Sequence, residues 1–174
     1  RPVAMETPQY QPWTSGSTIA IRGDEIFVVD EANDHVRILD RASGVVLHNV
    51  PVGARPHQLV VHPNGAVFVT NRHDATVSRI DGEDRDKVLT TAVGVEPWGL
   101  ALSPDAEVLY VSVAGTGDVV LLAPDSLAEI ARLPCFDRPS GIATSFLGVV
   151  AVAQRGDTTR IMLLDETSGL PIAV

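Results

Sequence analysis

A fourteen-residue phrase recurs along this chain, and a recurring period limits the possible folds more than any other feature. The phrase joins a short apolar run, a polar break and a second apolar run, as in FVTNRHDATVSRID from Phe68. Related phrases begin at Phe27 and at Tyr110, 41 and 42 residues away from it, and a weaker copy begins at Ala151. The chain is therefore predicted to contain four similar units, residues 15–53, 54–94, 95–135 and 136–174.

Each unit holds four apolar runs that are rich in Val and Ile and separated by turn sequences such as HPNG, SPDA, RHDAT and GTGD. Short β-branched runs between turns of this kind predict antiparallel strands. The segment PDSLAEIARL from Pro124 has helix-forming residues, but it occupies the place of a fourth strand and is interpreted as one. Four strands in about 40 residues are typical of one β-propeller blade. The predicted fold class is all-β, with four four-stranded antiparallel blades.

The repeat resembles the YVTN family of β-propeller proteins, whose typical unit has a Pro-x-Gly start, a Pro-Asp-Gly turn and Tyr-Val-Thr-Asn. The matching residues are Pro63, Gly65, the FVTN run from Phe68 to Asn71, Pro97, Gly99, Pro104, Asp105, Tyr110 and Val111. The resemblance covers about 160 of the 174 residues. It implies the fold more strongly than a function, because propellers host unrelated activities.

Complete members of this family have seven or so blades, and four blades leave two apolar faces uncovered, which soluble monomers avoid. Three arrangements are open: an open arc of a larger seven- or eight-bladed propeller, a homodimer that completes an eight-bladed ring, or tight closure of the four. The first is preferred, because residue 174 lies where the next unit would start. Residues 1–14 resemble no blade strand and are predicted to be a linker or a strand lent to another blade.

In propellers, the segments that lead into each blade and the loops between second and third strands gather around one mouth of the axis. Loops on a rigid scaffold are where binding residues concentrate. The candidate ligand-binding residues at this mouth are His57, Asn71, Arg72, His73, Asp74, Trp98, Asp34 and Arg155. Trp98 is expected either to stack on a ligand or to fill the axis as packing.

Two histidines near a carboxylate, His57 and His73 with Asp34 or Asp74, are a possible divalent-metal site or general base for a lactone or ester. The competing interpretation is plain surface loops, in which Asp and Asn stabilise turns. Because no HExxH, GxSxG or Gly-rich phosphate loop is present, this second interpretation is preferred. No catalytic residue, metal or cofactor is assigned.

The composition narrows the classes of partner. With 13 basic and 22 acidic residues, the net charge of -9 makes nucleic acid and anionic membrane surfaces unsuitable partners. No run approaches the roughly 18 to 20 apolar residues that span a bilayer, and Cys135 is the single cysteine, so an internal disulfide is excluded. The expected partners are a protein or the remaining propeller blades.

The function predicted from these features is a non-catalytic propeller scaffold or binding module. The resemblance implies a periplasmic or extracellular location, because such repeats are similar to those of bacterial periplasmic and surface-layer proteins. The alternative is the propeller part of an enzyme, either a lactonase-like hydrolase or a redox enzyme whose haem or metal centre lies elsewhere. The sequence has no Cys-x-x-Cys-His for a c-type haem.

Overall fold

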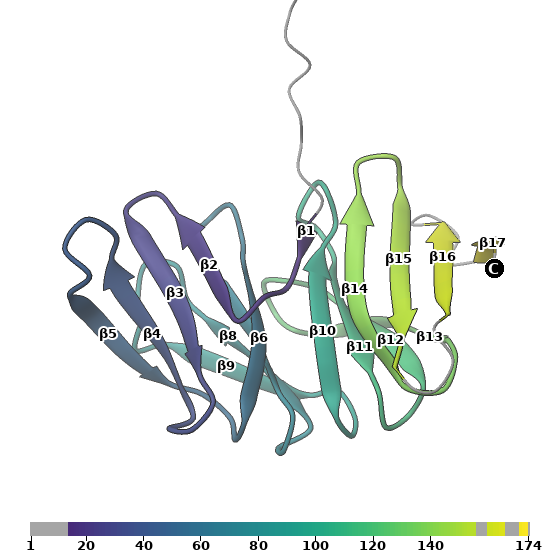
Figure 1. Ribbon diagram of the computed structural model, residues 1–174, viewed down its shortest axis with the longest axis horizontal. Helices are drawn as coiled ribbons and strands as arrows, with labels where there is room; N and C mark the ends of the chain where they lie inside the picture. The colour runs from purple at the N-terminus through teal and green to yellow at the C-terminus, as the bar shows by residue number, and fades with distance from the viewer. Residues whose placement is uncertain (1–13, 156–159, 166–170, 174) are drawn as a thin grey trace, which may run out of the picture.

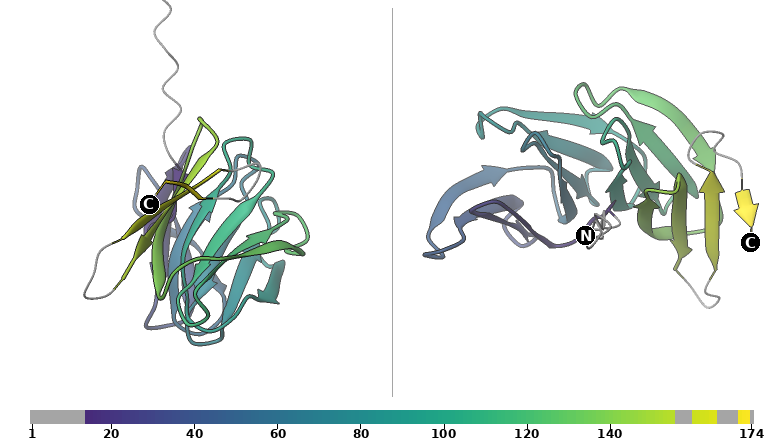
Figure 2. Two further views of the ribbon diagram at one scale, coloured as in Figure 1. Left: turned by 90° about the vertical axis from the view of Figure 1, so that its right-hand side faces the viewer. Right: turned by 90° about the horizontal axis from the view of Figure 1, so that it is seen from above.

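Four antiparallel sheets stand side by side in a curved row, as Figure 1 shows. The structure is a computed structural model, and it describes residues 14–155, 160–165 and 171–173. Seen from above in Figure 2, the row is an open arc and does not close into a ring. The predicted all-β fold of four antiparallel four-stranded blades is therefore confirmed, and the four blades do not close tightly on themselves.

The first two blades follow the chain order strand by strand. Blade 1 contains β2 (Ile19–Arg22), β3 (Glu25–Asp30), β4 (His35–Asp40) and β5 (Val46–Pro51). Blade 2 contains β6 (Pro56–Val61), β7 (Val67–Asn71), β8 (Thr76–Ile80) and β9 (Val88–Ala92). Each pair of neighbours is antiparallel, so each blade is a simple meander.

The last two blades repeat this order. Blade 3 contains β10 (Pro97–Leu102), β11 (Leu109–Val113), β12 (Asp118–Leu122) and β13 (Glu129–Pro134). Blade 4 contains β14 (Pro139–Ser145), β15 (Val149–Gln154), β16 (Ile161–Asp165) and β17 (Pro171–Ala173). The predicted strand within PDSLAEIARL is present as β13, because its cross-strand pairing with β12 outweighs the helix propensity of its residues. In the described part of the chain, no helix has the length and apolar character that a membrane crossing needs.

The hydrophobic core is divided among the gaps between blades. Phe27 and Ile38 of blade 1 share one cluster with Leu59 and Val69 of blade 2, and comparable clusters join blade 2 to blade 3 and blade 3 to blade 4. The burial of the second strand of each blade agrees with this arrangement. In β7 and β11 every residue is buried, whereas β3 and β15 of the outer blades are only partly buried. An inner blade is covered on both faces and an outer blade on one, as stacking of thin sheets requires.

A hydroxyl in the third position of the recurring phrase joins neighbouring blades. Thr70 Oγ1 of β7 donates to the backbone O of Trp98 in blade 3, at 3.1 Å. Ser112 of β11 makes the equivalent bond to the backbone O of Ser140 in blade 4. The approach is close enough that a Cβ on Gly99 would lie 2.3 Å from that same Ser140 oxygen. The Gly of the Pro-x-Gly start is therefore needed so that blades 3 and 4 can meet.

The residues before blade 1, 14–17, form a segment that we call the hub segment. Its strand β1 (Thr14–Ser15) pairs with β14, which gives blade 4 a fifth strand on its inner edge. Gly16 N then donates to Leu100 O of blade 3 at 2.6 Å, and Ser17 forms an antiparallel bridge with Leu59 of blade 2. The hub segment thus bonds to the inner strands of blades 4, 3 and 2 before the chain enters blade 1.

Candidate binding site at the propeller mouth

Two sets of loops are hydrogen bonded together at one end of the blades, and we call the surface that they form the mouth. Arg72 N donates to Arg55 O, and Arg155 N donates to Arg138 O, each at 3.0 Å. In both cases a loop after the second strand bonds to the segment that leads into the same blade. Arg55 and Arg138 each precede a proline and have a positive φ, of 53° and 54°. This left-handed conformation is unusual for a residue other than glycine, so the bonded loops must hold it in place.

Trp98 lies at the centre of the described mouth residues and is contacted from the blades on both sides of its own. The guanidinium carbon of Arg72, from blade 2, is 4.1 Å from the centre of the indole ring. That of Arg155, from blade 4, is 4.2 Å from it. Both distances lie within the range of cation–π attraction, which is about 6 Å. The ring of Trp98 is therefore in contact with one arginine from each of the two neighbouring blades.

His57 completes the group around Trp98. Its ring centre is 4.5 Å from that of Trp98, with the two planes at 64°, which is an edge-on contact. Burial lowers the pKa of His57, and the positive charges of Arg72 and Arg155 lower it further, whereas Glu31 raises it. The imidazole is accordingly held in its neutral form near pH 7. Of the candidates from the sequence, His57, Arg72, Trp98 and Arg155 are brought together, and we call these four residues the Trp98 cluster.

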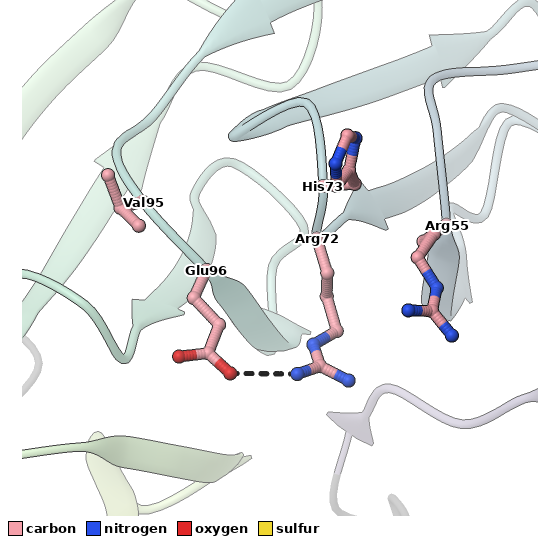
Figure 3. Close-up of a pocket in the computed structure, with 5 residues that line it drawn as sticks. All are labelled: Arg55, Arg72, His73, Val95 and Glu96. Carbon is pink, nitrogen blue, oxygen red and sulfur yellow. Dashed lines mark hydrogen bonds and ion pairs between the residues drawn. The ribbon is translucent and has the colours of Figure 1, made fainter.

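A pocket opens beside the Trp98 cluster, with a volume of about 380 Å³ and a lining of Arg55, Arg72, His73, Val95 and Glu96. Figure 3 shows Arg72 between Glu96 and Arg55, with Arg72 Nη2 bonded to Glu96 Oε1 at 2.7 Å. The buried Nε of Arg72 has no hydrogen-bond partner among the described residues. The pocket wall therefore has guanidinium groups, one carboxylate and one exposed apolar side chain.

Asp34 and Asp74 have structural bonds at the mouth. Asp34 Oδ1 accepts the backbone N–H of Arg55 at 2.8 Å, and Asp74 Oδ2 accepts that of Ala54 at 2.6 Å. Asp34 lies in a loop of blade 1 and Asp74 in a loop of blade 2, so the segment that joins the two blades is fixed from both sides. These contacts order the backbone on which Arg55 and His57 are placed.

Asn71 is fully buried beneath the mouth. Its Nδ2 donates to Thr76 Oγ1 at 3.0 Å and to Ser78 Oγ at 2.8 Å. A Cβ on Gly53 would lie 2.6 Å from the Asn71 amide nitrogen, so the neighbouring glycine makes room for this side chain. The contacts are those of a residue that holds β7 to β8.

The surroundings of His73 differ from those of His57, which lies against Trp98. The side chain of His73 is 75% exposed, and its Nδ1 is 4.0 Å from Asp74 Oδ1, beyond normal hydrogen-bond distance. Within residues 14–155, 160–165 and 171–173, no group of three His, Cys, Asp or Glu side chains is placed to hold a metal ion.

Sequence reasoning missed the residue immediately before the proline of each lead-in segment. Arg55 and Glu96 occupy this place and line the pocket, and Arg138 occupies it in blade 4. A signal was present, because a charged residue precedes the proline in three successive units. The candidates predicted in the lead-in segments, His57 and Trp98, follow the proline instead of preceding it.

Comparison with known proteins gives relatives over part of the chain. No protein-family model matches it. A protein from Salmonella typhi, described as the uncharacterized protein YncE, is 31% identical over 111 residues, which cover 63% of this chain. The match covers 31% of the relative, so this chain spans about a third of the length of the curated relatives that it matches.

Two solved structures have the same fold. Hydrazine synthase from Kuenenia stuttgartiensis aligns with a TM-score of 0.79 at 19% identity, over 87% of this chain and 45% of its own. The dihydro-heme d1 dehydrogenase NirN, in complex with DHE, aligns with a TM-score of 0.72 at 24% identity, over 86% of this chain and 34% of its own. The predicted resemblance to β-propeller repeat proteins is confirmed by these likenesses, which at such identities establish the fold alone.

Proposed function

We propose that this chain is a non-catalytic binding module built on propeller blades, with the mouth as its binding surface. The observation that carries the proposal is the convergence of Arg72, Arg155 and His57 on Trp98. Side chains from three blades meet there, so the cluster depends on the stacked blades and is held by rigid strands. A preformed group of this kind suits recognition of a ligand or a partner.

The surroundings of the two histidines favour binding over catalysis. A general base needs a partner that orients it and a pKa close to the working pH. His57 lies against the Trp98 ring with its pKa lowered, and His73 lacks a close carboxylate bond in the described structure. Among the residues that the structure describes, no carboxylate is hydrogen bonded to either ring in the way that commonly orients a catalytic imidazole.

The outer faces of blades 1 and 4 are proposed to be covered by further blades or by a protein partner. On β2, Ala20 packs into the core between blades 1 and 2, whereas Ile19 and Ile21 point the other way and are 52% and 58% exposed. On β16, Leu164 is in the core and Ile161 is 58% exposed. Both solved structures are longer than this chain, which spans 45% and 34% of them.

The solution mass of the chain tests how these faces are covered. If further blades cover them, light scattering should give a monomer of 18.5 kDa that binds an apolar-surface dye strongly. A stable dimer with little dye binding would support a homodimeric eight-bladed ring and contradict the preferred arrangement.

A metal and activity assay tests the binding role. The purified chain should contain no stoichiometric metal and should show no turnover of lactones or esters. His57→Ala and His73→Ala should leave both results unchanged. A bound metal that either substitution removes, together with hydrolysis, would refute the non-catalytic role.

The second candidate is the propeller part of an enzyme, with a lactonase-like activity or with a haem or metal centre outside this segment. The specific observation in its favour is that two of the solved structures that align with this chain are named as a synthase and a dehydrogenase. The binding role suits the mouth better, because its histidines lack the hydrogen-bonded setting of a catalytic base in the described structure.

The protein is further proposed to act in the periplasm or outside the cell. The similarity of the repeats to those of periplasmic and surface-layer proteins supports this location. Cell fractionation of the source organism provides the test, and recovery of the protein in the cytoplasmic fraction would contradict it.

A further inference from the structure

The Trp98 cluster concentrates positive charge on a protein that is acidic overall. The net charge of the chain is -9, yet Arg72 and Arg155 both lie within about 4 Å of one indole ring, at 4.1 and 4.2 Å. Arg55 lines the pocket next to Arg72. Like charges repel, so such a gathering costs free energy unless counter-charges offset it. A cost of this kind that is not offset is typical of functional sites.

The described counter-charge at the mouth is incomplete. Arg72 has one bond to Glu96, at 2.7 Å, and Arg55 has a longer contact to Glu31, at 3.3 Å. Among the residues that the structure describes, Arg155 has no carboxylate within ion-pair distance, and its side chain is exposed. Of the carboxylates described at the mouth, only Glu31 and Glu96 are paired with these three guanidinium groups, because Asp34 and Asp74 accept backbone N–H groups.

The hydrogen-bonding capacity of Arg72 is also largely unused. A guanidinium has five N–H donors in a planar fork. Only Nη2 of Arg72 has a described hydrogen bond, and its buried Nε has no partner among the described residues. A buried donor without an acceptor costs about 1 to 3 kcal/mol. An acceptor with two oxygens would use the fork better than the single Glu96 oxygen does.

The pocket has a size and lining that suit a small organic molecule. Its volume of about 380 Å³ lies within the range of small-molecule sites, which is about 300 to 1,000 Å³. Val95, which is 64% exposed, adds an apolar contact beside the charged groups. A flat protein epitope would not need such a hollow.

We propose that the mouth binds a small organic anion with carboxylate or phosphate groups, held by Arg72 and Arg155 with Trp98 as their common support. Guanidinium forks bind both groups in a bidentate manner, and arginines already placed against an aromatic ring lose little freedom when they do so. This inference rests on the proposed binding role of the mouth and adds the class of its ligand.

Titration with citrate and with inorganic phosphate at constant ionic strength tests the proposal. The readouts are calorimetry and the fluorescence of Trp98 in a Trp13→Phe background, because these are the two tryptophans of the chain. We expect saturable binding of at least one anion, with a change in Trp98 emission. Tight citrate with weak phosphate would indicate an organic polycarboxylate, and the reverse would indicate a phosphate-bearing ligand.

Two substitutions at the site and one away from it identify the groups involved. Arg155→Gln and Arg72→Gln should each weaken binding about tenfold or more, because each removes charge-assisted hydrogen bonds. Arg41→Gln removes the same charge from an exposed turn after β4 and should leave binding unchanged. Arg155→Lys, which keeps the charge without the fork, should give an intermediate affinity. Circular dichroism checks that each variant is folded.

The proposal is overturned if neither anion binds saturably to the wild-type chain, or if Arg41→Gln weakens binding as much as the substitutions at the mouth. Either result would leave the metal, turnover and mass measurements unaffected. Failure of the anion site can therefore be told apart from failure of the proposed binding role.

Discussion

Thr70 gives a direct test of how neighbouring blades are joined. Its side chain is fully buried, and Oγ1 accepts the backbone N–H of Gln58 at 3.2 Å while donating to Trp98 O at 3.1 Å. Thr70→Val keeps the shape of the side chain and removes the hydroxyl. One donor and one acceptor then lose their partner at the junction of blades 2 and 3.

The expected loss follows from those two groups. An unsatisfied buried group costs about 1 to 3 kcal/mol, and both groups here are only partly buried, so we expect a total near 2 kcal/mol. In a chain of this size about 1 kcal/mol shifts the Tm by roughly 2 to 4 °C, so the Tm should fall by about 4 to 8 °C. Because Thr70 bonds to Trp98, the emission of Trp98 should change as well.

The assay is urea and thermal unfolding followed by circular dichroism and by Trp98 fluorescence. Thr70→Ser is the first control, since Ser112 makes the equivalent bond in blade 3, and it should keep the Trp98 signal. Thr116→Val, in an exposed turn, is the second and should change the stability by less than about 0.5 kcal/mol. The reasoning is refuted if Thr70→Val is as stable as wild type, or if Thr116→Val loses as much.

Other substitutions test close contacts and titrating groups. Gly99→Ala should destabilise the chain by about 1 to 3 kcal/mol in urea unfolding, because the new Cβ would lie 2.3 Å from Ser140 O. Gly141→Ala is the control and should be tolerated, because its Cβ would lie 3.8 Å from the nearest atom. Equal losses in both would contradict this. Because the folded state lowers the pKa of His57, the unfolded chain takes up that proton first, so stability should fall as the pH drops through about 6.5, and His57→Gln should flatten this part of the pH profile. Two backbone N–H groups, those of Glu83 and Asp84, lower the pKa of Asp81 to about 2. The contribution of Asp81 to stability should therefore be fully present above pH 3.8 and be lost as the pH falls through 2. Asp81→Asn should remove this acid dependence of stability, and an unchanged pH profile would argue against the assignment.

The blades could be predicted from the sequence because each one repeats the same pattern of apolar runs and turn residues. Turn residues bound every Val- and Ile-rich run, and the pairing of β13 with β12 agrees with the place of that segment in the period. Such signals are local or periodic, so a single sequence contains them. The open arc was the preferred one of three arrangements, since four thin blades cannot cover both end faces by themselves.

The arrangement of the mouth was predictable only in part. The period placed Arg72, Trp98 and Arg155 at the same end of the blades, but their convergence depends on side-chain directions across three blades. Asn71 was expected at the mouth surface and is buried instead. In an inner blade both faces are covered, so the alternation of a strand does not tell which polar residue reaches solvent.

The hub segment has a consequence for the order in which the molecule is assembled during synthesis. Thr14 pairs with Thr144, about 130 residues further along, so β1 has no strand partner until the first strand of blade 4 has left the ribosome. Blades 1 to 3 are able to stack as they emerge, whereas closing so long a loop is entropically costly and slow. The strand β1 is therefore synthesised before the four described blades but docks only after β14 has been made, and its docking then holds blade 4 to the start of this segment.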